Sequence, residues 1–409
     1  MTAPILSPPP LFTGEYFQNP YPAFTWLREN SPVHPLTFPV GNLPMWLVTR
    51  YEDVRAILGD HNRFSSDAPR WATEDFKKAG MAFGTGTVIE QILSVLDPPD
   101  HTRVRKLAMG AFTPRRTATW KEPTEQIVQS ALDRMQRMEQ PDVMEFASIV
   151  PAEVIGRVLG IPLDRFKEIL HAIERALHVD PEHTDESTKA YQEIVDYGRE
   201  VITEKRRNPG DDLTTTFIDA RDGDDRLDED ELVALVALMI MVGLDTTRNL
   251  IGSGVLALLD HPDQRDLLRA EPQLADTAVE EFLRYDGALT VALIRFTKED
   301  VEVAGTRIPA GSTVIAALQS ANRDPAYFAH PDRLDITRNG DARHLGLGHG
   351  LHNCLGAALA RLETRIAVPA VFERFPDLSL AVPRSDLRYG ESWLLRSLES
   401  LPVHLNSKE

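Results

Sequence analysis

Residues 344–363 read HLGLGHGLHNCLGAALARLE and contain the chain's one cysteine, Cys354. The stretch before Cys354 is rich in glycine, and the stretch from Ala357 onward consists of good helix formers. We therefore expect a tight loop that ends at Cys354 and a helix that begins directly after it. A cysteine at a helix N-terminus lies among free N–H groups and the positive end of the helix dipole, and both favour the thiolate.

Taken alone, this pattern is compatible with several roles for Cys354. A lone cysteine is most often an inert buried thiol. It can also be a nucleophile paired with His349 or His352, or a metal ligand beside them, although the spacing is not a common zinc pattern. A thiolate ligand to haem iron is a further role. A dinucleotide-binding loop at glycines 346–350 is excluded, because no buried strand precedes it and the helix starts too late.

A second segment, residues 228–259, has the pattern of a long buried helix. Asp228 is a good N-cap, and Glu231 follows three residues later as in a capping box. Residues 232–244 are apolar on every side, so this part of the helix should be buried all round.

The apolar run ends in GLDTT, residues 243–247. A buried carboxylate at Asp245 and two buried hydroxyls are costly unless they are hydrogen-bonded or functional. Threonine side chains can bond helix carbonyls and bend the helix, and Gly243 weakens it locally. From the residues alone, a satisfied polar kink is the favoured interpretation.

Most of the remaining chain is helical by its apolar spacing, and the strand signals are few. The clearest helical segments are 123–139, 151–180 and 188–207. Residues 45–51 form one expected strand, and residues 301–304 and 313–318 are expected to pair as a hairpin through Gly305. Glycine and proline are spread evenly, so we predict a mainly α single domain over residues 1–409 with a minor β part. About residues 1–15 form an extended N-terminal tail.

The composition excludes several classes of protein. The chain has 409 residues, of which 42% are hydrophobic and 26% charged, which is typical of a globular protein. One cysteine permits neither an internal disulfide nor a cysteine-rich metal cluster, and it suits a reducing cytosol. A net charge of -18 disfavours nucleic acid and anionic membranes as partners. We see no targeting signal and no membrane-spanning segment, and we expect a cytoplasmic monomer.

Residues 347–356 resemble the haem-binding loop of the cytochrome P-450 family, Phe-Gly-x-Gly-x-(His/Arg)-x-Cys-x-Gly. The matching residues are Gly348, Gly350, His352, Cys354 and Gly356. Leu347 stands where the family usually has phenylalanine, and Asn353 where an apolar residue is common. The resemblance implies a P-450-type haem domain with a long buried central helix, and haem b with Cys354 as its thiolate ligand.

Further segments extend the resemblance over most of the chain. Residues 243–247 match (Ala/Gly)-Gly-x-(Asp/Glu)-Thr-(Thr/Ser) in the central helix, except that Val242 replaces the small first residue and should narrow access to the iron. Glu281 and Arg284 match Glu-x-x-Arg, and Arg333 is the expected third member of that structural cluster. The residues implied to bind the haem propionates are His101, Arg105, Arg295 and His352.

The resemblance implies a haem-thiolate monooxygenase that uses O2 as co-substrate. Thr246 is expected to hydrogen-bond the oxygen, Asp245 to help deliver protons, and Gly243 to make room for both. Electrons are expected from a ferredoxin and a ferredoxin reductase, so NAD(P)H takes part only indirectly. The ferredoxin is expected to dock on residues 101–121, a segment that contains basic residues and no acidic ones. In this segment Arg103 and Lys106 should point to solvent. The redox-partner face consists of Arg103, Lys106, Arg115 and Arg116.

The expected substrate is a bulky apolar small molecule that is hydroxylated, epoxidised or oxidatively coupled, in secondary-metabolite (natural-product) biosynthesis. The residues expected to line its pocket are Phe83, Ile92, Met239, Val242, Leu289, Val291, Trp393 and Leu394. Two alternatives remain if the resemblance holds. The protein could be a monooxygenase of xenobiotic catabolism, or a haem-thiolate protein that binds a ligand without turning it over. A Cys/His metal or hydrolase site is the alternative outside the resemblance.

Overall fold

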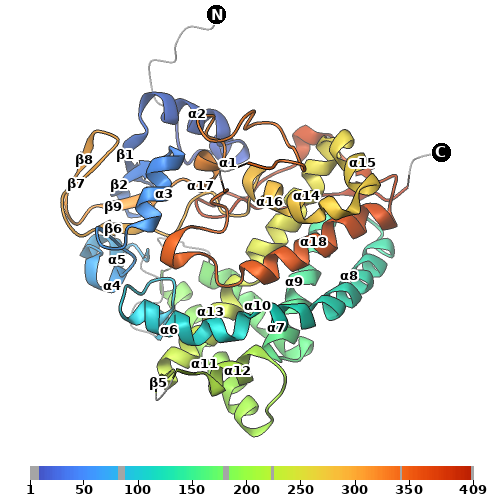
Figure 1. Cartoon of the computed structure of the whole chain (residues 1–409), viewed down its shortest axis with the longest axis horizontal. Helices are drawn as coiled ribbons and strands as arrows, with labels where there is room; N and C mark the ends of the chain where they lie inside the picture. The colour runs from blue at the N-terminus through green and yellow to red at the C-terminus, as the bar shows by residue number, and fades with distance from the viewer. Residues whose placement is uncertain (1–8, 82–87, 178–183, 223–224, 341–342, 407–409) are drawn as a thin grey trace, which may run out of the picture.

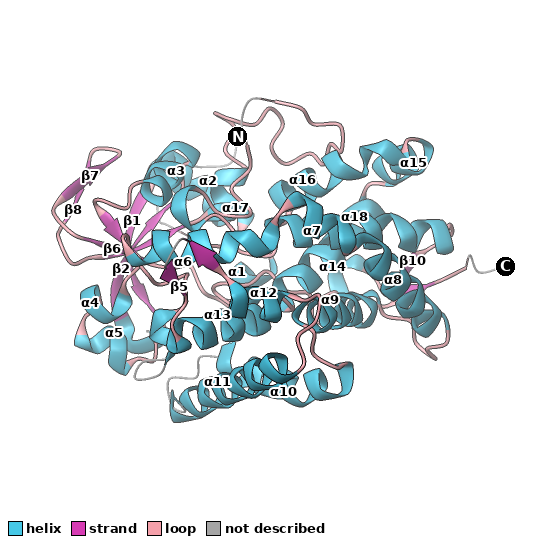
Figure 2. Cartoon of the chain, turned by 60° about the horizontal axis from the view of Figure 1, so that its bottom comes forward, coloured by secondary structure: helices cyan, strands magenta, loops and turns pink. Residues whose placement is uncertain are grey.

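The computed structural model describes residues 9–81, 88–177, 184–222, 225–340 and 343–406. Helices make up most of the molecule, and the larger sheet lies at one side of it (Figures 1 and 2). The α-helices are α1 (Gly14–Gln18), α2 (Tyr21–Asn30), α3 (Tyr51–Gly59), α4 (Ala68–Trp71), α5 (Glu74–Lys78), α6 (Asp100–Met109), α7 (Pro114–Thr119), α8 (Lys121–Gln136), α9 (Val143–Leu159), α10 (Leu163–Leu177), α11 (Thr184–Arg207), α12 (Leu213–Asp219), α13 (Glu229–Val242), α14 (Asp245–Asp260), α15 (Pro262–Ala270), α16 (Ala275–Tyr285), α17 (Leu318–Asn322) and α18 (Ala357–Arg374). The strands are β1 (Val33–Phe38), β2 (Leu43–Val48), β3 (Phe64–Ser65), β4 (Arg221–Asp222), β5 (Asp225–Arg226), β6 (Arg295–Thr297), β7 (Val301–Val303), β8 (Thr306–Ile308), β9 (Thr313–Ala316), β10 (Ser379–Leu380) and β11 (Val403–His404).

The predicted fold class, mainly α with a minor β part, is confirmed. Of the predicted N-terminal tail, residues 9–13 are described and not helical, and α1 begins at Gly14. Among the described residues, none of the helices combines the length and the apolar character that crossing a membrane requires.

The central helix begins as the sequence predicts. The Asp228 carboxylate accepts from the N–H of Glu231 at 2.9 Å, and the Glu231 carboxylate accepts from the N–H of Asp228 at 2.9 Å. This capping box satisfies two N–H groups that the first turn of a helix leaves without partners. The apolar side chains of residues 232–241 in α13 are then buried on every side, as expected from their distribution.

The central helix does not run unbroken to residue 259, as the sequence had suggested. It ends at Val242 and resumes as α14 at Asp245. Thr246 Oγ1 donates to the carbonyl of Val242 at 3.0 Å, so at the break this carbonyl accepts a hydrogen bond from a side chain. A Cβ on Gly243 would lie 2.9 Å from the Met239 carbonyl oxygen, so this position has no room for a side chain.

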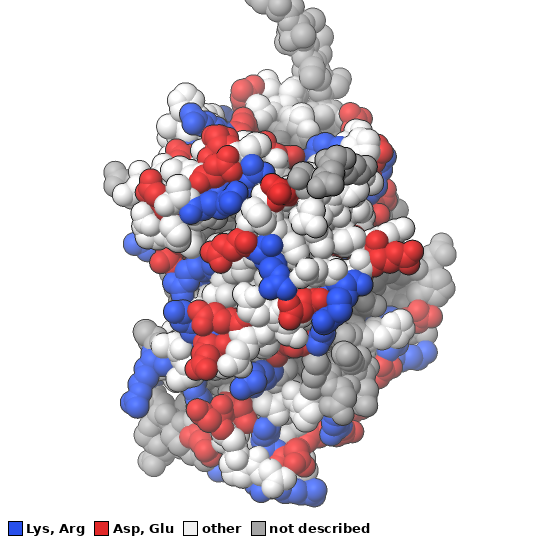
Figure 3. Space-filling model, turned by 90° about the vertical axis from the view of Figure 1, so that its right-hand side faces the viewer, with Lys and Arg blue, Asp and Glu red and all other residues white. Residues whose placement is uncertain are grey.

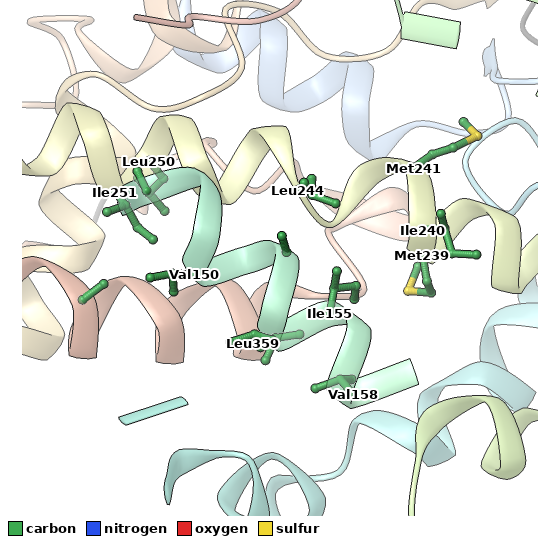
Figure 4. Close-up of a cluster of buried hydrophobic side chains, with 14 of the residues drawn as sticks. Val150, Ile155, Val158, Met239, Ile240, Met241, Leu244, Leu250, Ile251 and Leu359 are labelled. Carbon is green, nitrogen blue, oxygen red and sulfur yellow. The ribbon is translucent and has the colours of Figure 1, made fainter. Parts of the chain in front are cut away.

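The core forms around the break. Figure 4 shows Met239 and Leu250 from the two central helices beside Ile155 of α9 and Leu359 of α18, and all four belong to one hydrophobic cluster. α11 packs on α13, while α9, α16 and α18 pack on α14. The break between α13 and α14 is therefore held from several sides by close-packed apolar side chains.

The main sheet has the strand order β1-β2-β9-β6-β3. The predicted hairpin of residues 301–304 with 313–318 is wrong. β7 pairs instead with β8, through a turn at Ala304 and Gly305, which have φ angles of +47° and +75°. All four residues of β9 are buried, and this strand lies between β2, to which it is parallel, and β6, to which it is antiparallel. A fully buried strand needs a partner on both edges, which a two-stranded hairpin cannot supply.

Candidate functional site

A large cavity lies between the break in the central helix and the loop that ends at Cys354. It encloses about 1530 Å³ not filled by protein atoms, its open mouth included. Its walls come from α6, α13, α14, residues 288–295 and residues 346–363. The lining combines a thiol, basic side chains and many apolar side chains, which suits a polar-ended cofactor and an apolar ligand.

The loop before Cys354 is held by its own backbone. The N–H of Cys354 donates to the carbonyl of Leu347 at 2.9 Å, and the N–H of Gly348 donates to that of Leu345 at 2.8 Å. Gly350 has a φ angle of +72°, and a Cβ there would lie 2.6 Å from the Leu58 carbonyl oxygen. The predicted helix begins at Ala357, so Cys354 stands at the entrance to α18 as expected.

The thiol of Cys354 faces the cavity, and its surface is exposed there. Burial of its surroundings raises the pKa of the thiol, while a hydrogen bond from the N–H of Gly356 and the charges of Arg105 and Arg361 lower it. The net direction is upward, against the lowered pKa expected for a cysteine at a helix N-terminus, and the exposed side of the sulphur faces the cavity.

The other roles of Cys354 find little support. The described residues contain no group of three or more His, Cys, Asp or Glu side chains that could hold a metal ion by themselves. His352 Nε2 lies 3.1 Å from Ser66 Oγ, and its ring stacks on His101 at 4.3 Å between centroids, so it is not placed as a base for the thiol. A metal held through one protein thiolate would have to bring its remaining ligands with it.

The predicted propionate ligands His101, Arg105, Arg295 and His352 come together at one end of the cavity. His101 is completely buried, and neither of its ring nitrogens has a hydrogen-bond partner. Burial, followed by the charge of Arg105, lowers the pKa of His101 to about 4. Burial lowers the pKa of His352 to about 2 and that of Arg295 to about 10. Buried donors in such numbers fit an anionic ligand.

Few acidic side chains oppose this cluster. The nearby carboxylate of Asp97 accepts from Ser65 Oγ at 2.6 Å, from the N–H of Ser66 at 2.9 Å and from Lys298 at 3.0 Å. Arg105 donates to the carbonyl of Asn353 at 2.7 Å, so one of the basic residues is tied directly to the cysteine loop. Positive charge and unpartnered donors therefore face the cavity at this end.

The opposite wall comes from the break in the central helix. Val242, Gly243, Thr246 and Thr247 line the cavity, whereas Asp245 begins α14 and is not among the residues that line it. The side chain of Val242 is 42% exposed although its helix is buried, because it borders the cavity.

Only some of the residues predicted for the substrate pocket line this cavity. Of the described candidates, Met239, Val242 and Leu289 line the cavity, and Ile92, Val291, Trp393 and Leu394 do not. Ile92 and Val291 are each 3% exposed within the core, and Trp393 packs edge-on against Phe38. Phe83 lies outside the described residues. The cavity is also lined by Leu93, Leu238, Ala292 and Leu293, which lie within the segments expected to contribute to the pocket, and by Phe112, Ile155 and Ala288, which do not.

A further cavity residue had not been expected. Glu363 of α18 is 2% exposed, and its Oε2 has no hydrogen-bond partner. Burial raises the pKa of this carboxyl well above its ordinary value. The sequence does carry a signal, since Glu363 lies one turn after Leu359 and therefore on the apolar face of its helix.

The Glu-x-x-Arg pair is buried as expected, but its third member is a different arginine. Glu281 accepts from Arg284 at 2.7 and 2.8 Å, and both side chains are almost fully buried. Arg338, not Arg333, completes the cluster, with its Nε 3.0 Å from Glu281 Oε2. Arg333 is exposed and contributes only its backbone carbonyl, which accepts from Arg284 and Arg338. Beyond Arg333 the chain turns, and this turn places the side chain of Arg338 against the Glu281 carboxylate.

The basic segment proposed for docking is partly neutralised. Arg103, expected to point to solvent, instead pairs with Glu231 and with Asp225, the latter at 3.2 Å. Arg116 pairs with Asp211 at 2.6 Å. The two remaining residues of that face, Lys106 and Arg115, are exposed. On the face of the molecule in Figure 3, basic and acidic side chains are likewise interspersed rather than gathered in patches of one sign.

The residues present fit an anionic, metal-containing cofactor such as haem. One exposed thiol can serve as a metal ligand, a buried His/Arg cluster can bind carboxylates, and the space between them is large and mostly apolar. Comparison with known proteins points the same way, since the family model "Cytochrome P450" matches residues 10–381.

Relatives cover nearly the whole chain. Vitamin D(3) 25-hydroxylase of Pseudonocardia autotrophica is 42% identical over 97% of this chain and 96% of its own length. The 6-deoxyerythronolide B hydroxylase of Saccharopolyspora erythraea is 37% identical over 97% of this chain and 99% of its own. The solved structure of the Bacillus subtilis polyketide-synthase P450 PksS has a TM-score of 0.88 at 36% identity, covering 97% of this chain and 99% of that one. The chain therefore belongs to the cytochrome P450 family of haem-dependent monooxygenases.

Proposed function

We propose that this protein is a haem-thiolate monooxygenase that oxidises a bulky apolar small molecule in natural-product tailoring. The observation that carries the proposal is the arrangement of the cavity, with the Cys354 thiol at one side and the His101–His352–Arg295 cluster at its end. Cys354 would bind the iron of haem b, and the basic cluster, with Arg105, would bind its two propionates. The bound haem supplies dioxygen activation, in which two electrons and two protons are consumed as one oxygen atom enters the substrate and the other leaves as water.

The chain's own residues would position the bound oxygen and supply protons to it. Thr246 already uses its hydroxyl hydrogen on the Val242 carbonyl, so its oxygen can accept a further hydrogen bond from the cavity side. Gly243 lines the cavity at the break, where its missing side chain lets the backbone pack closely against Met239 and Ile155. Asp245, at the first turn of α14, is proposed to relay protons from outside the cavity toward Thr246.

The substrate class is supported by the cavity and by relatives. The lining away from the basic end is apolar, with Leu238, Met239, Val242 and Leu289 on the side of the helix break. One relative is named for polyketide biosynthesis and another as a mycinamicin IV hydroxylase/epoxidase. These names favour a large, mainly apolar natural product as the substrate of this chain, hydroxylated or epoxidised.

The electron donor is proposed to be a ferredoxin, itself reduced through an NAD(P)H-dependent reductase. The docking face is narrower than the sequence suggested, because Arg103 and Arg116 already have acidic partners. Lys106 and Arg115 remain exposed and are the residues to test. Reduction that slows steeply as salt is raised, and slows in Lys106→Ala and Arg115→Ala, is the expected result.

The ligand assignment is tested by spectroscopy of the purified protein. With dithionite and CO, the native chain should give the red-shifted Soret band of a thiolate ligand, and Cys354→Ser should lose it. A normal CO-bound band in Cys354→Ser would remove Cys354 from the role.

The role of Thr246 is tested by coupling, that is, product formed per NAD(P)H consumed, once a screen for spectral shifts has identified a substrate. Thr246→Ala should lower coupling because the side-chain hydroxyl is gone, and Thr246→Ser should restore it. Equal coupling in all three proteins would contradict the assignment.

A further inference from the structure

Glu280, His344 and Arg361 form a cluster behind the cysteine loop. Glu280 of α16 accepts from Arg361 of α18 in a two-pronged pair, with Oε1–Nε at 2.5 Å and Oε2–Nη2 at 2.9 Å. The same Oε2 lies 2.9 Å from His344 Nε2. Although burial opposes ionisation, the hydrogen bonds from His344 and Arg361 hold the pKa of Glu280 at about 2, so its carboxylate is charged at any working pH.

His344 links this carboxylate to the loop that carries Cys354. The N–H of Gly346 donates to His344 Nδ1 at 3.1 Å, so Nδ1 carries no proton and Nε2 is the nitrogen that donates to Glu280. A Cβ on Gly346 would lie only 2.5 Å from the Leu283 carbonyl oxygen, so the loop backbone rests directly on α16. Helix α16 thus fixes the loop through one hydrogen-bonded side chain and one close backbone contact.

Arg361 brings positive charge to the other side of the loop. It lies on α18 two turns after Cys354, and with Arg105 it is one of the two cations whose charge acts on the thiol. Its guanidinium cannot turn away while both of its donors are bound to Glu280. Arg361 therefore has a fixed position beside the cysteine loop, and Glu280 of α16 is the residue that fixes it.

We propose that Glu280, His344 and Arg361 are positioning residues of the thiolate ligand. They hold the Cys354 loop against α16 and set, through the balance of the Glu280 and Arg361 charges, the reduction potential of the iron. This inference rests on the proposed function, in which Cys354 binds haem iron, and adds to it three residues outside the cavity.

The charges of Glu280 and Arg361 predict that removing one or the other shifts the reduction potential of the iron in opposite directions. Positive charge near the iron favours the ferrous over the ferric state, because the ferrous centre has the smaller positive charge. Glu280→Gln leaves Arg361 uncompensated and should raise the potential, whereas Arg361→Gln should lower it. For each single variant we expect the ferrous-to-ferric ratio at a fixed applied potential to change by about threefold. For a one-electron couple, at about 59 mV per tenfold change, this corresponds to a shift of roughly 28 mV in the reduction potential. The double variant should return toward the native value.

The chain offers a matched control one turn away on the same two helices. Asp276 of α16 and Arg365 of α18 form the equivalent pair at 2.6 Å, one turn farther along α18 from Cys354 and more open to solvent on the Asp276 side. Asp276→Asn and Arg365→Gln remove the same kind of link between α16 and α18. They should leave the potential within experimental error of the native value.

The measurement is a spectrophotometric redox titration of each haem-loaded protein at low ionic strength. Opposite shifts for Glu280→Gln and Arg361→Gln, with none for the control pair, support the inference. The same potential in all variants, shifts of one sign, or equal shifts in the control pair would overturn it. If Glu280→Gln fails to fold, the sign for Arg361→Gln relative to Arg365→Gln still decides. These outcomes differ from failure of the proposed function, in which the native protein itself lacks the thiolate Soret band.

The loop contact is tested separately with His344. His344→Ala removes the acceptor for the N–H of Gly346, and part of the ferrous–CO band should move to the position of a protonated, non-thiolate ligand. His344→Asn keeps an acceptor at the same place on the side chain and should retain the native band. Identical ferrous–CO spectra for the two variants would refute this part of the inference.

Discussion

Arg338→Leu tests which arginine supports the buried pair of Glu281 and Arg284. Arg338 donates to Glu281 at 3.0 Å and to the carbonyl of Ala329 at 2.8 Å, and its side chain is only 18% exposed. A hydrogen bond to a charged group contributes about 1.5–3 kcal/mol, whereas loss of a buried pair's only partner costs about 3–5 kcal/mol. Because Glu281 keeps both of its bonds to Arg284, we expect Arg338→Leu to lower the free energy of unfolding by about 2–3 kcal/mol. Arg333→Leu should cost no more than about 0.5 kcal/mol, since that side chain is exposed.

The assay is equilibrium unfolding in urea, followed by far-ultraviolet circular dichroism on cofactor-loaded proteins at one concentration. The denaturant slope should stay the same in both variants, so that the midpoint reports stability directly. A loss in Arg333→Leu as large as that in Arg338→Leu would refute the reasoning, as would a midpoint for Arg338→Leu that equals the native one.

Three further predictions concern other parts of the molecule. Burial raises the pKa of Glu363 above 4.5, so the unfolded chain binds fewer protons above that pH and this residue lowers stability as pH rises. The stability gained by Glu363→Gln over the native chain should therefore be larger at pH 8 than at pH 5, and urea unfolding at the two pH values checks it. Gly287→Ala should destabilise by about 1–3 kcal/mol through overpacking, because a Cβ there would lie 2.6 Å from the Leu283 carbonyl oxygen, which is backbone. Gly110→Ala, with open space around its Cβ, should not, and thermal unfolding compares the two. Arg295→Leu removes a buried donor from the proposed propionate end, so haem should transfer faster to an acceptor apoprotein, and an unchanged transfer rate would contradict the assignment.

Local patterns predicted the parts of the site that lie close together in the sequence. The capping box, the apolar helix and the cysteine loop each depend on residues within one or two turns of one another, so their spacing contains the information. The interruption at Gly243 was predicted as a kink, and the structure makes it a full break, because Thr246 takes the Val242 carbonyl. The strength of such a break depends on neighbouring helices, which the sequence does not display.

Features that need long-range packing could not be predicted in the same way. Arg333 and Arg338 lie five residues apart in an irregular segment, and only the path of the backbone decides which side chain reaches Glu281. Leu289 and Val291 lie two residues apart, a spacing that places side chains on one face of an extended strand, yet only Leu289 lines the cavity. The pairing of Arg103 with Glu231 joins residues more than a hundred positions apart, so a solvent-facing arginine was the natural expectation from α6 alone.

The single cysteine has a practical consequence for handling the protein. A thiol-directed label can react with the chain at one position only, and that position faces the cavity. Bound cofactor would shield it, so labelling stoichiometry should report the fraction of molecules without haem. Once the cofactor is loaded, a cysteine introduced anywhere on the surface would be the sole reactive thiol. Site-specific fluorophores or cross-linkers could then be attached without first removing a native cysteine.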